Sequence, residues 1–549
     1  MRRLCNVKRG RWDTVLKILL FALNASYTHT NLAVRCIKKS LIASGYQCDI
    51  AEFNIKDKRR RILEALVSAN ADIYGFSTYI WNAREMYSLA ADLKALKPSA
   101  IVVFGGPEVS FDTDEIIAAH PFIDCIITGE GEGAFAALAE MCERGQKLPR
   151  VIDGGVWDGF LQEDAVYSPD EPLGTSRIVY YESSRGCPYR CAYCLSSISG
   201  MVRAKSVDIT LGQLLEFERI DHIKIIKFVD RTFNFDIERA KAIWRGLMSE
   251  KYTKSYHFEI CAELLDEESF ELLAAFPKGK IQLEIGVQSI NPDTLVRVDR
   301  SPKTERLIAN ITRLHGMGNM HIHADLIAGL PGEDFASFAR SFDALYGRCD
   351  MLQLGFLKLL RGSKLRHNAD DFGCVYSSEP PYEVLSTDTI SFDELCRLHD
   401  VDDANDRYSG GAFERAMTII MARTKSPFYT LLSIADGYRR DGLRISEVSQ
   451  PRAYELLFRY ASVGDDRALS EALVLDFLMS QKLSAPSIGG FELKKGSDRL
   501  KRDFMRYADE NGIEYFAPAL ECREGTREYV IDRRNMRAFA LSGDSFVEM

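Results

Sequence analysis

The sequence predicts an α/β protein with two zones of alternating strands and helices, followed by a mainly helical C-terminal zone. Short runs rich in β-branched residues alternate with amphipathic stretches over 15–145 and again over 178–360. After about residue 365 this rhythm disappears. A chain of 549 residues exceeds what one core usually supports, so we expect several domains. We place domains at 1–148, 173–365 and 366–549, with a Gly-, Asp- and Pro-rich linker at 149–172.

The composition excludes several classes of protein. With 46% hydrophobic and 27% charged residues, the chain is neither mainly disordered nor collagen-like nor a coiled-coil rod. The net charge of −9 gives no general attraction to nucleic acid or anionic lipid. No apolar run reaches 18 residues and no signal-peptide pattern is present, so we expect no membrane association and a cytoplasmic location. Thirteen cysteines then favour thiols and metal ligands over disulfides.

The first zone is predicted to be a doubly wound, Rossmann-like domain of flavodoxin-like type. Its strands are apolar along their whole length, which is typical of a parallel sheet covered on both faces by helices. The predicted strands are Val15–Ala25, Gln47–Ile55, Ile73–Tyr79, Ile101–Pro107 and Cys125–Gly131, and the predicted helices are Asn31–Gly45, Arg59–Ala71, Ala83–Ser99, Thr113–His120 and one from Glu132.

Glycine and polar residues gather at the carboxyl ends of these strands, where ligands of such sheets bind. Glycine allows close approach to the backbone, and hydroxyl groups supply hydrogen bonds. The candidate ligand-binding residues are Ser26, Tyr27, Ser77, Tyr79, Gly105, Gly106, Pro107, Glu108, Gly129, Glu130, Gly131 and Glu132.

The second zone predicts six strand–helix units with no seventh or eighth. This number favours a partial, open (β/α)6 barrel of the TIM type, with its active site at the carboxyl ends of the strands. The predicted strands are Ile178–Ser184, Ile223–Asp230, Tyr256–Glu263, Ile281–Ser289, His321–Leu330 and Met351–Leu360, and the predicted helices are Leu211–Ile220, Ile237–Glu250, Glu267–Phe276, Thr304–Met317 and Phe335–Arg348.

The third zone shows four helical stretches and no recognisable chemical motif. A strand and turn are predicted over 528–541. The predicted helices are Ala412–Arg423, Tyr429–Asp441, Arg452–Ala461 and Ala468–Gln481.

Three cysteines follow the first barrel strand at the spacing C-x3-C-x2-C: Cys187, Cys191 and Cys194. Three thiolates in one loop can hold three irons of a 4Fe–4S cluster and leave the fourth iron open to another ligand. A structural zinc site would need a fourth Cys or His nearby, and the nearest histidine downstream is His222. The spacing therefore favours an iron–sulfur cluster.

This loop, with Tyr193 just before its last cysteine, resembles the cluster motif of the radical S-adenosylmethionine (SAM) superfamily. Strand ends that carry Phe228–Arg231, Glu284–Ser289 and Leu326–Glu333 resemble that superfamily as well. The resemblance implies a cluster whose open iron binds SAM and whose electron cleaves SAM to a 5′-deoxyadenosyl radical. By the same resemblance Glu263, Glu284 and Gln288 contact the methionine or ribose part of SAM, Tyr193 flanks the cofactors, and the backbone near Gly329 meets adenine.

The first zone resembles the cobalamin (B12)-binding domain that precedes the radical SAM core in one large subgroup. The resemblance implies a cobalamin-dependent radical SAM enzyme that methylates or otherwise modifies an unactivated carbon of an unidentified small-molecule or peptide substrate, with a reductase or flavodoxin-type electron donor. The D-x-H-x-x-G motif of some corrinoid domains is absent, and His29 and His120 are the only histidines of this zone. In this subgroup the corrinoid is usually held without a protein histidine.

Other interpretations remain open at this point. A radical SAM enzyme whose first domain no longer binds cobalamin would use that domain to dock substrate or a partner. A non-catalytic iron–sulfur carrier or sensor would need neither a barrel nor SAM-binding carboxylates. His321 and His323 share one face of a strand and either line the active site or form a core pair. A second cluster, as in tRNA methylthiotransferases, would draw on Cys5, Cys36, Cys48, Cys125 and Cys142, which fit core thiols better.

Overall fold

We describe the fold from a computed structural model of the 549-residue chain. Two compact units are formed by residues 16–334 with 347–391, and by residues 335–346 with 392–549. Within the described part of the chain, no helix combines the length and apolarity needed to cross a bilayer. The structure describes residues 16–162, 166–167, 178–198, 200–464, 466–480, 494–495, 498–514, 520–524, 527–532, 534–535, 537–542 and 545–549.

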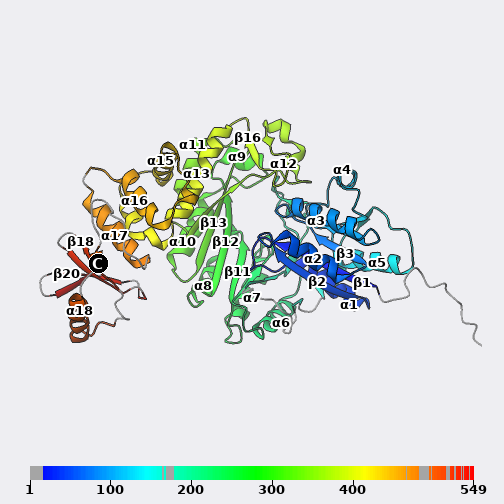
Figure 1. The fold of residues 1–549 in the computed structure, drawn as a ribbon, viewed down its shortest axis with the longest axis horizontal. Coiled ribbons are helices and arrows are strands. Elements are labelled where there is room, and N and C mark those ends of the chain that lie inside the picture. The colour runs from blue at the N-terminus through cyan, green and yellow to red at the C-terminus, as the bar shows by residue number, and fades with distance from the viewer. Residues whose placement is uncertain are drawn as a thin grey trace, which may run out of the picture. The chain divides into compact units, whose positions relative to one another are not determined.

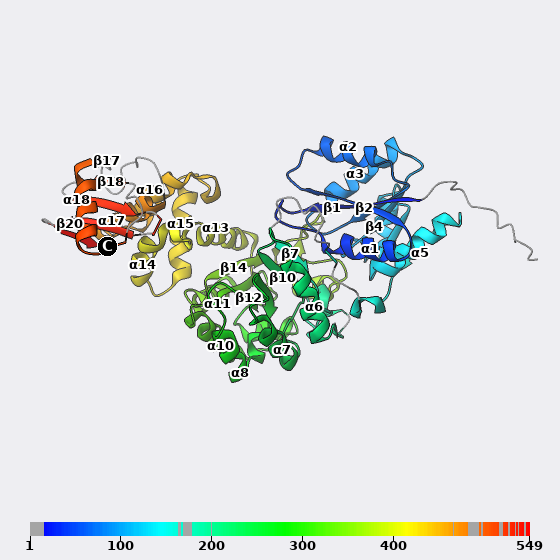
Figure 2. The ribbon, with the colours of Figure 1, turned by 90° about the horizontal axis from the view of Figure 1, so that it is seen from below.

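The first unit begins with a six-stranded parallel sheet in the order β2-β1-β3-β4-β5-β6, which confirms the predicted doubly wound, flavodoxin-like topology. Helices α2 and α3 cover one face and α1 and α5 the other, each over its own hydrophobic core (Figures 1 and 2). The strands are β1 (Lys17–Asn24), β2 (Gln47–Asn54), β3 (Ile73–Ser77), β4 (Ile101–Gly105), β5 (Cys125–Thr128) and β6 (Val151–Asp153), and the helices are α1 (Leu32–Ala43), α2 (Arg59–Ala69), α3 (Ala83–Leu96), α4 (Thr113–Ala119) and α5 (Gly131–Glu143).

Strand β6 lies inside the segment predicted as a linker. It pairs in parallel with β5, with Val151 opposite Ile126. Three residues are too few to show a period, so the sequence pattern could not indicate this strand. The linker prediction was therefore wrong for the start of 149–172.

A second parallel sheet of six strands follows, in the order β14-β13-β12-β11-β10-β7. Its two edge strands do not pair, so the sheet is a partial, open barrel, as predicted. Along β12 buried and partly buried residues alternate, with Leu283 and Ile285 on the helix side and Glu284 on the inner face. The strands are β7 (Ile178–Tyr181), β10 (Ile225–Phe228), β11 (Ser255–Ile260), β12 (Ile281–Gln288), β13 (His321–Ala328) and β14 (Met351–Phe356).

Helices and two small hairpins complete the first unit. One hairpin, β8 with β9, brackets the three cysteines of the C-x3-C-x2-C motif, and the other joins β15 to β16. These elements are β8 (Ser184–Arg185), β9 (Arg203–Ala204), α6 (Val207–Glu218), α7 (Ile237–Leu247), α8 (Glu267–Ala274), α9 (Pro292–Arg297), α10 (Glu305–Gly316), α12 (Lys364–His367), β15 (Val375–Tyr376) and β16 (Val384–Ser386).

The second unit is helical up to Ser480 and then contains a five-stranded antiparallel sheet, of which the sequence predicted only one strand and a turn. Helix α18 packs Leu500 and Phe504 against Val530 and Phe539 of that sheet. Helix α11 groups with this unit, so the boundary differs from the predicted one at 365/366. The elements are α11 (Phe335–Leu345), α13 (Phe392–Tyr408), α14 (Glu414–Ala422), α15 (Pro427–Arg440), α16 (Gln450–Ala461), α17 (Arg467–Ser480), β17 (Lys494–Lys495), α18 (Asp498–Glu510), β18 (Leu520–Glu524), β19 (Arg527–Asp532), β20 (Arg537–Ser542) and β21 (Ser545–Glu548).

Candidate active site

A cavity of about 1030 Å³ lies inside the first unit, at the carboxyl ends of the strands of the first sheet. Its other wall is formed by the start of the barrel. This wall consists of Tyr180, Glu182 and the two ends of the cysteine loop, namely 184–186 and Leu195, Ser196 and Ile198. The carboxyl end of a doubly wound sheet is where ligands of this fold bind. Of the predicted ligand-binding residues, the cavity is lined by Ser77, Tyr79, Gly105, Gly106, Pro107, Gly129, Glu130, Gly131 and Glu132.

Three residues predicted for this ligand site do not line the cavity. Glu108 is buried and points to a later segment, where its carboxylate accepts a hydrogen bond from Tyr382 and lies 3.6 Å from Nε of Arg361. Burial raises the pKa of Glu108. Tyr27 is 69% exposed, and the Ser26 hydroxyl is 3.2 Å from that of Thr28. Glu108, Ser26 and Tyr27 are thus outside the cavity lining, and their role in ligand binding stays a prediction.

The glycines at the strand ends are required by the backbone. Gly106 has φ of 113°, and a Cβ there would lie 2.4 Å from the carbonyl oxygen of Thr78. Gly129 has φ of 67°, and its Cβ would lie 2.9 Å from the nitrogen of Gly155. Both conformations are ones that side-chain-bearing residues rarely adopt. Glycine at these two positions is therefore needed for the chain to turn at the rim of the cavity.

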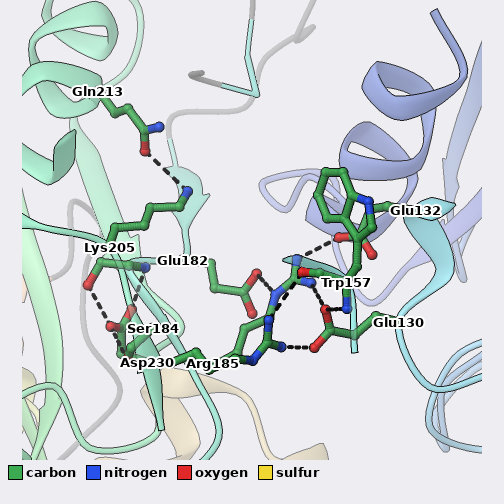
Figure 3. Close-up of polar contacts among 11 residues, drawn as sticks. Glu130, Glu132, Trp157, Glu182, Ser184, Arg185, Lys205, Gln213 and Asp230 are labelled. Atoms are coloured by element: carbon green, nitrogen blue, oxygen red, sulfur yellow. Dashed lines mark hydrogen bonds and ion pairs between the residues drawn. The ribbon is translucent and has the colours of Figure 1, made fainter. Parts of the chain in front are cut away.

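Glu130 and Glu132 point toward the barrel and bind arginines (Figure 3). Arg185 lies 2.8 Å from Glu130 and 2.6 Å from Glu132, and Arg203 forms a further ion pair with Glu130. The backbone nitrogen of Trp157 donates to Glu130 at 2.9 Å. The two carboxylates that the sequence assigned to ligand binding thus also join the first sheet to the cysteine loop.

The cysteine loop leaves the β8–β9 hairpin and is held from both sides. The nitrogen of Ala192 donates to the carbonyl of Val298 at 3.0 Å, and the carbonyl of Ala192 accepts from the nitrogen of Leu365 at 2.8 Å. Within the loop the Ser197 hydroxyl donates to the carbonyl oxygens of Cys191, at 3.0 Å, and Cys194, at 2.5 Å. The loop is therefore fixed in shape by the chain itself.

The three thiols fit a cluster better than a single ion. Four thiolates around one zinc lie about 4 Å apart, given Zn–S bonds near 2.3 Å. Among the described residues, the only three or more ligand atoms within 4.8 Å of one another belong to Glu238, Asp266 and Glu268, which surround Lys241. The three cysteines are not among such groups in the described part of the chain. In a cluster this closeness is not needed, because each thiolate would bind a different iron.

Arg300 supplies positive charge at the cysteine loop. Its Nη1 lies 3.9 Å from Sγ of Cys191 and donates to the hydroxyl of Tyr193 at 3.1 Å. Burial raises the pKa of Cys191, and the Arg300 charge opposes that rise. An iron–sulfur cluster bound by thiolates is anionic, so a guanidinium here would stabilise one. Sequence reasoning did not single out Arg300, and no local motif marks it.

The Gln288 side chain and Arg300 both approach Gly286. Nη2 of Arg300 donates to the carbonyl of Gly286 at 2.7 Å, and a Cβ at Gly286 would meet Nε2 of Gln288 at 2.3 Å. Gln288 sits at a break in the β12–β13 register with φ of 72°. Its Oε1 is buried and has no hydrogen-bond partner among the described residues. Such an orphaned acceptor suits a ligand donor.

The other residues predicted to contact SAM occupy different positions. Glu263 accepts a hydrogen bond from the Cys261 thiol at 3.6 Å, and that thiol accepts one from Tyr189 of the cysteine loop at 3.3 Å. Gly329 follows β13 with φ of 83°. Glu284 lies in mid-strand, 3.1 Å from Lys227 and 3.3 Å from His257. Its hydrogen bond with His257 helps to lower its pKa to about 2. Glu284 thus belongs to a charged group on the inner face, and its contact with SAM stays a prediction.

The inner face of the barrel carries further polar groups, of which the sequence prediction named His321 and His323 and missed Asp325 and Glu259. Burial, followed by the nearby Glu284 charge, raises the pKa of Asp325 to about 7. Burial also raises that of Glu259 to about 7. His323 lies with its ring 4.6 Å from that of His321, on this face and not in the apolar core. Polar residues at alternate positions of β11 and β13 were the available signal.

The remaining cysteines of the first sheet are core thiols. Cys48, Cys125 and Cys142 belong to one hydrophobic cluster. Burial raises the pKa of Cys48 and Cys125 to about 12 and of Cys142 to about 11. Thiols held in the neutral form are poor metal ligands. Cys36 lines the cavity, and Cys5 lies outside the described residues.

Family models match three stretches of the chain. Residues 18–139 match the B12 binding domain, residues 181–345 match the Radical SAM superfamily, and residues 370–531 match a protein of unknown function (DUF4080). The first two stretches coincide with the two parallel sheets. The third lies mostly in the second unit.

Curated relatives and solved structures agree with these matches. The cobalamin-dependent radical SAM methyltransferase TokK of Streptomyces tokunonensis is 25% identical over 312 residues, which cover 50% of this chain and 44% of that protein. The hopanoid C-3 methylase of Methylococcus capsulatus is 25% identical over 284 residues, or 48% of this chain and 54% of that protein. The chain thus spans about half the length of these relatives.

The fold is shared with two structurally characterised proteins. The cobalamin-dependent S-adenosylmethionine radical enzyme OxsB, solved with aqua-cobalamin and S-adenosylmethionine bound, aligns with a TM-score of 0.59 at 15% identity over 95% of this chain and 83% of that one. The radical S-adenosylmethionine methyltransferase TsrM of Kitasatospora setae aligns with a TM-score of 0.54 at 17% identity, over 66% of this chain and 78% of that one. With both family matches on the sheets that build its site, the chain is a radical SAM protein with an N-terminal B12-binding domain.

Proposed function

We propose that this protein is a cobalamin-dependent radical SAM enzyme, which transfers a methyl group to, or otherwise modifies, an unactivated carbon of a small-molecule or peptide substrate. One observation carries the proposal: a single large cavity is bounded by the carboxyl edge of the B12-binding sheet and by both ends of the cysteine loop. A corrinoid in that cavity would lie against the place where SAM meets the cluster. The relatives named as methyltransferases support methyl transfer.

The residues present fit the three cofactors. Cys187, Cys191 and Cys194 would hold three irons of a 4Fe–4S cluster, with Arg300 beside one thiolate. The open acceptor of Gln288, the Glu263 carboxylate and the backbone near Gly329 would hold SAM. The cavity lining at 105–107 and 129–131 would face the corrinoid.

When bound, these cofactors supply the difficult chemistry: an electron from the cluster cleaves the sulfonium of SAM to methionine and a radical that removes a hydrogen atom, and cobalamin carries the methyl group. The chain positions them and excludes water. Apolar groups such as Val229 and Ile198 line the cavity beside polar ones. A flavodoxin-type reductase is the proposed source of the electron.

The test is anaerobic purification from cells supplied with cobalamin, followed by iron, sulfide and corrinoid analysis and incubation with SAM and dithionite. We expect iron and sulfide at cluster stoichiometry, bound corrinoid, and release of 5′-deoxyadenosine. The matched control replaces Cys187, Cys191 and Cys194 with Ala, and should retain corrinoid but neither iron nor SAM cleavage. Full iron without corrinoid would favour a first domain that docks substrate or a partner. A cluster that neither binds nor cleaves SAM would favour a carrier or sensor.

A further inference from the structure

Arg185 stands between the cavity and the cysteine loop. Its guanidinium lies 2.8 Å from Glu130, 2.6 Å from Glu132 and 2.9 Å from Glu182, so that one guanidinium binds three carboxylates (Figure 3). Only 14% of its side chain is exposed. Charge-assisted contacts of this kind are short, directional and strong when they are shielded from water. In the chain, Arg185 is followed directly by Gly186 and Cys187.

The hairpin that carries the cysteine loop is attached to the B12-binding domain at its base. Arg185 of β8 pairs with Arg203 of β9, and both side chains bind the same carboxylate, that of Glu130. All three cysteines lie between these two arginines. Glu130 and Glu132 belong to the turn that starts α5, at the rim of the cavity. The base of the cluster loop is therefore fixed to the turn that would face the corrinoid.

The barrel side of the same hairpin is held by a separate buried group. The hydroxyls of Ser183 and Ser184 donate to Oδ1 of Asp230, at 2.6 and 2.5 Å, and the nitrogen of Ser183 donates to its Oδ2 at 2.9 Å. Asp230 is fully buried. The strand before Arg185 is thus rigidly placed in the barrel. Arg185 and Gly186 connect this fixed segment to the first cysteine of the loop.

We propose that Arg185 is a positioning residue that couples occupancy of the cavity by corrinoid to the binding of SAM at the cluster. We call the ion pairs of Arg185 with Glu130 and Glu132 the arginine clamp. The cavity is lined by all three of these residues and by Gly186, so a ligand in the cavity would contact the arginine clamp. The arginine clamp in turn fixes the position of the backbone that leads to Cys187. This inference rests on the proposed function. By linkage the effect is reciprocal: corrinoid changes SAM affinity by the same factor as SAM changes corrinoid affinity.

The experiment measures SAM affinity on the oxidised cluster, without turnover, in anaerobic protein that is either free of cobalamin or loaded with it. For the wild type we expect the two dissociation constants to differ about fivefold or more. Glu132→Gln keeps the side-chain volume, and Arg185→Gln removes the guanidinium. In both variants we expect the ratio to fall below about twofold, with iron content unchanged, and the ratio is taken only from protein whose corrinoid loading has been measured. Arg185→Lys, which keeps charge without the guanidinium, should give an intermediate ratio.

Arg59→Gln is the matched control, because Arg59 bridges two carboxylates, Glu85 and Asp92, in the same domain and does not line the cavity. It should keep the wild-type ratio. The electron paramagnetic resonance spectrum of the reduced cluster, recorded with and without cobalamin, provides a readout that lowered stability alone would not alter. A wild-type ratio of one, or loaded variants that keep the wild-type ratio, would overturn the inference. A wild type that takes up no corrinoid would instead overturn the proposed function, and the inference with it.

Discussion

Arg300 donates a hydrogen bond to the hydroxyl of Tyr193 at 3.1 Å, and the same nitrogen lies 3.9 Å from Sγ of Cys191. This guanidinium therefore contacts both a thiol and an aromatic hydroxyl of the cysteine loop. Replacing Arg300 with Met should make the cluster harder to reduce, because positive charge favours the reduced, more anionic form. We expect SAM cleavage to slow on the order of tenfold. A redox titration followed by electron paramagnetic resonance checks this, with exposed Arg190→Met of the same loop as control. An unchanged reduction potential would remove Arg300 from this role.

Each cysteine of the C-x3-C-x2-C loop should be required for the cluster. Cys187→Ala, Cys191→Ala and Cys194→Ala should each abolish the visible absorbance and all 5′-deoxyadenosine formation, because each removes one of only three protein ligands. Cys261→Ala is a demanding control, since that thiol contacts Tyr189 of the same loop. It should keep the cluster. Loss of iron in Cys261→Ala, with iron retained in a triad variant, would show that the ligand set is wrong.

Gln288 and Glu263 should hold SAM without holding iron. Gln288→Ala removes the buried acceptor at Oε1 and should weaken SAM binding about three- to tenfold, the value of one hydrogen bond. Glu263→Ala should act in the same direction. Gln282→Ala, on the same face of the same strand, is the control. Equilibrium dialysis with iron analysis measures both properties, and loss of iron in both test variants would contradict their role.

Asp325 should make the first unit less stable as pH rises. Its pKa is raised from 3.8 to about 7, chiefly by burial, and its Oδ1 has no hydrogen-bond partner among the described residues. The folded state therefore binds a proton that the unfolded state has lost, so stability falls as pH rises from about 4 to 7. Asp325→Asn should raise the melting temperature, by an amount that grows over this range and is constant above it. Equal shifts at pH 5 and pH 8, measured by thermal unfolding, would show that Asp325 keeps an ordinary pKa.

No protein histidine should coordinate cobalt. His120 stacks on Tyr87, with ring centroids 3.9 Å apart, and does not line the cavity. His29 does line it, but its Nδ1 contacts the hydroxyl of Tyr180. Burial and the Lys227 charge lower the pKa of His29. His29→Ala and His120→Ala should both leave the spectrum of cob(II)alamin unchanged. Loss of nitrogen hyperfine structure in His29→Ala would identify His29 as a ligand.

Much of the architecture could be predicted from the sequence because its signals are local. Apolar strands that alternate with amphipathic helices indicated both parallel sheets. The three cysteines lie within eight residues, so their proximity follows from chain connectivity alone. The glycines at the ends of β4 and β5 marked the rim of the cavity for a similar reason, since parallel strands end at one edge.

The tertiary structure alone decided which partner each side chain meets. Arg300 reaches Tyr193 across 107 positions of sequence, and Glu108 turns away from the cavity to Tyr382 across 274. Glu130 and Glu132 looked like ligand-binding residues but bind Arg185 as well. The direction of a side chain at a strand end depends on the backbone of the following turn, and its partner depends on how two separately folded sheets pack together. Neither depends on neighbouring residues in the sequence, so no local pattern could indicate them.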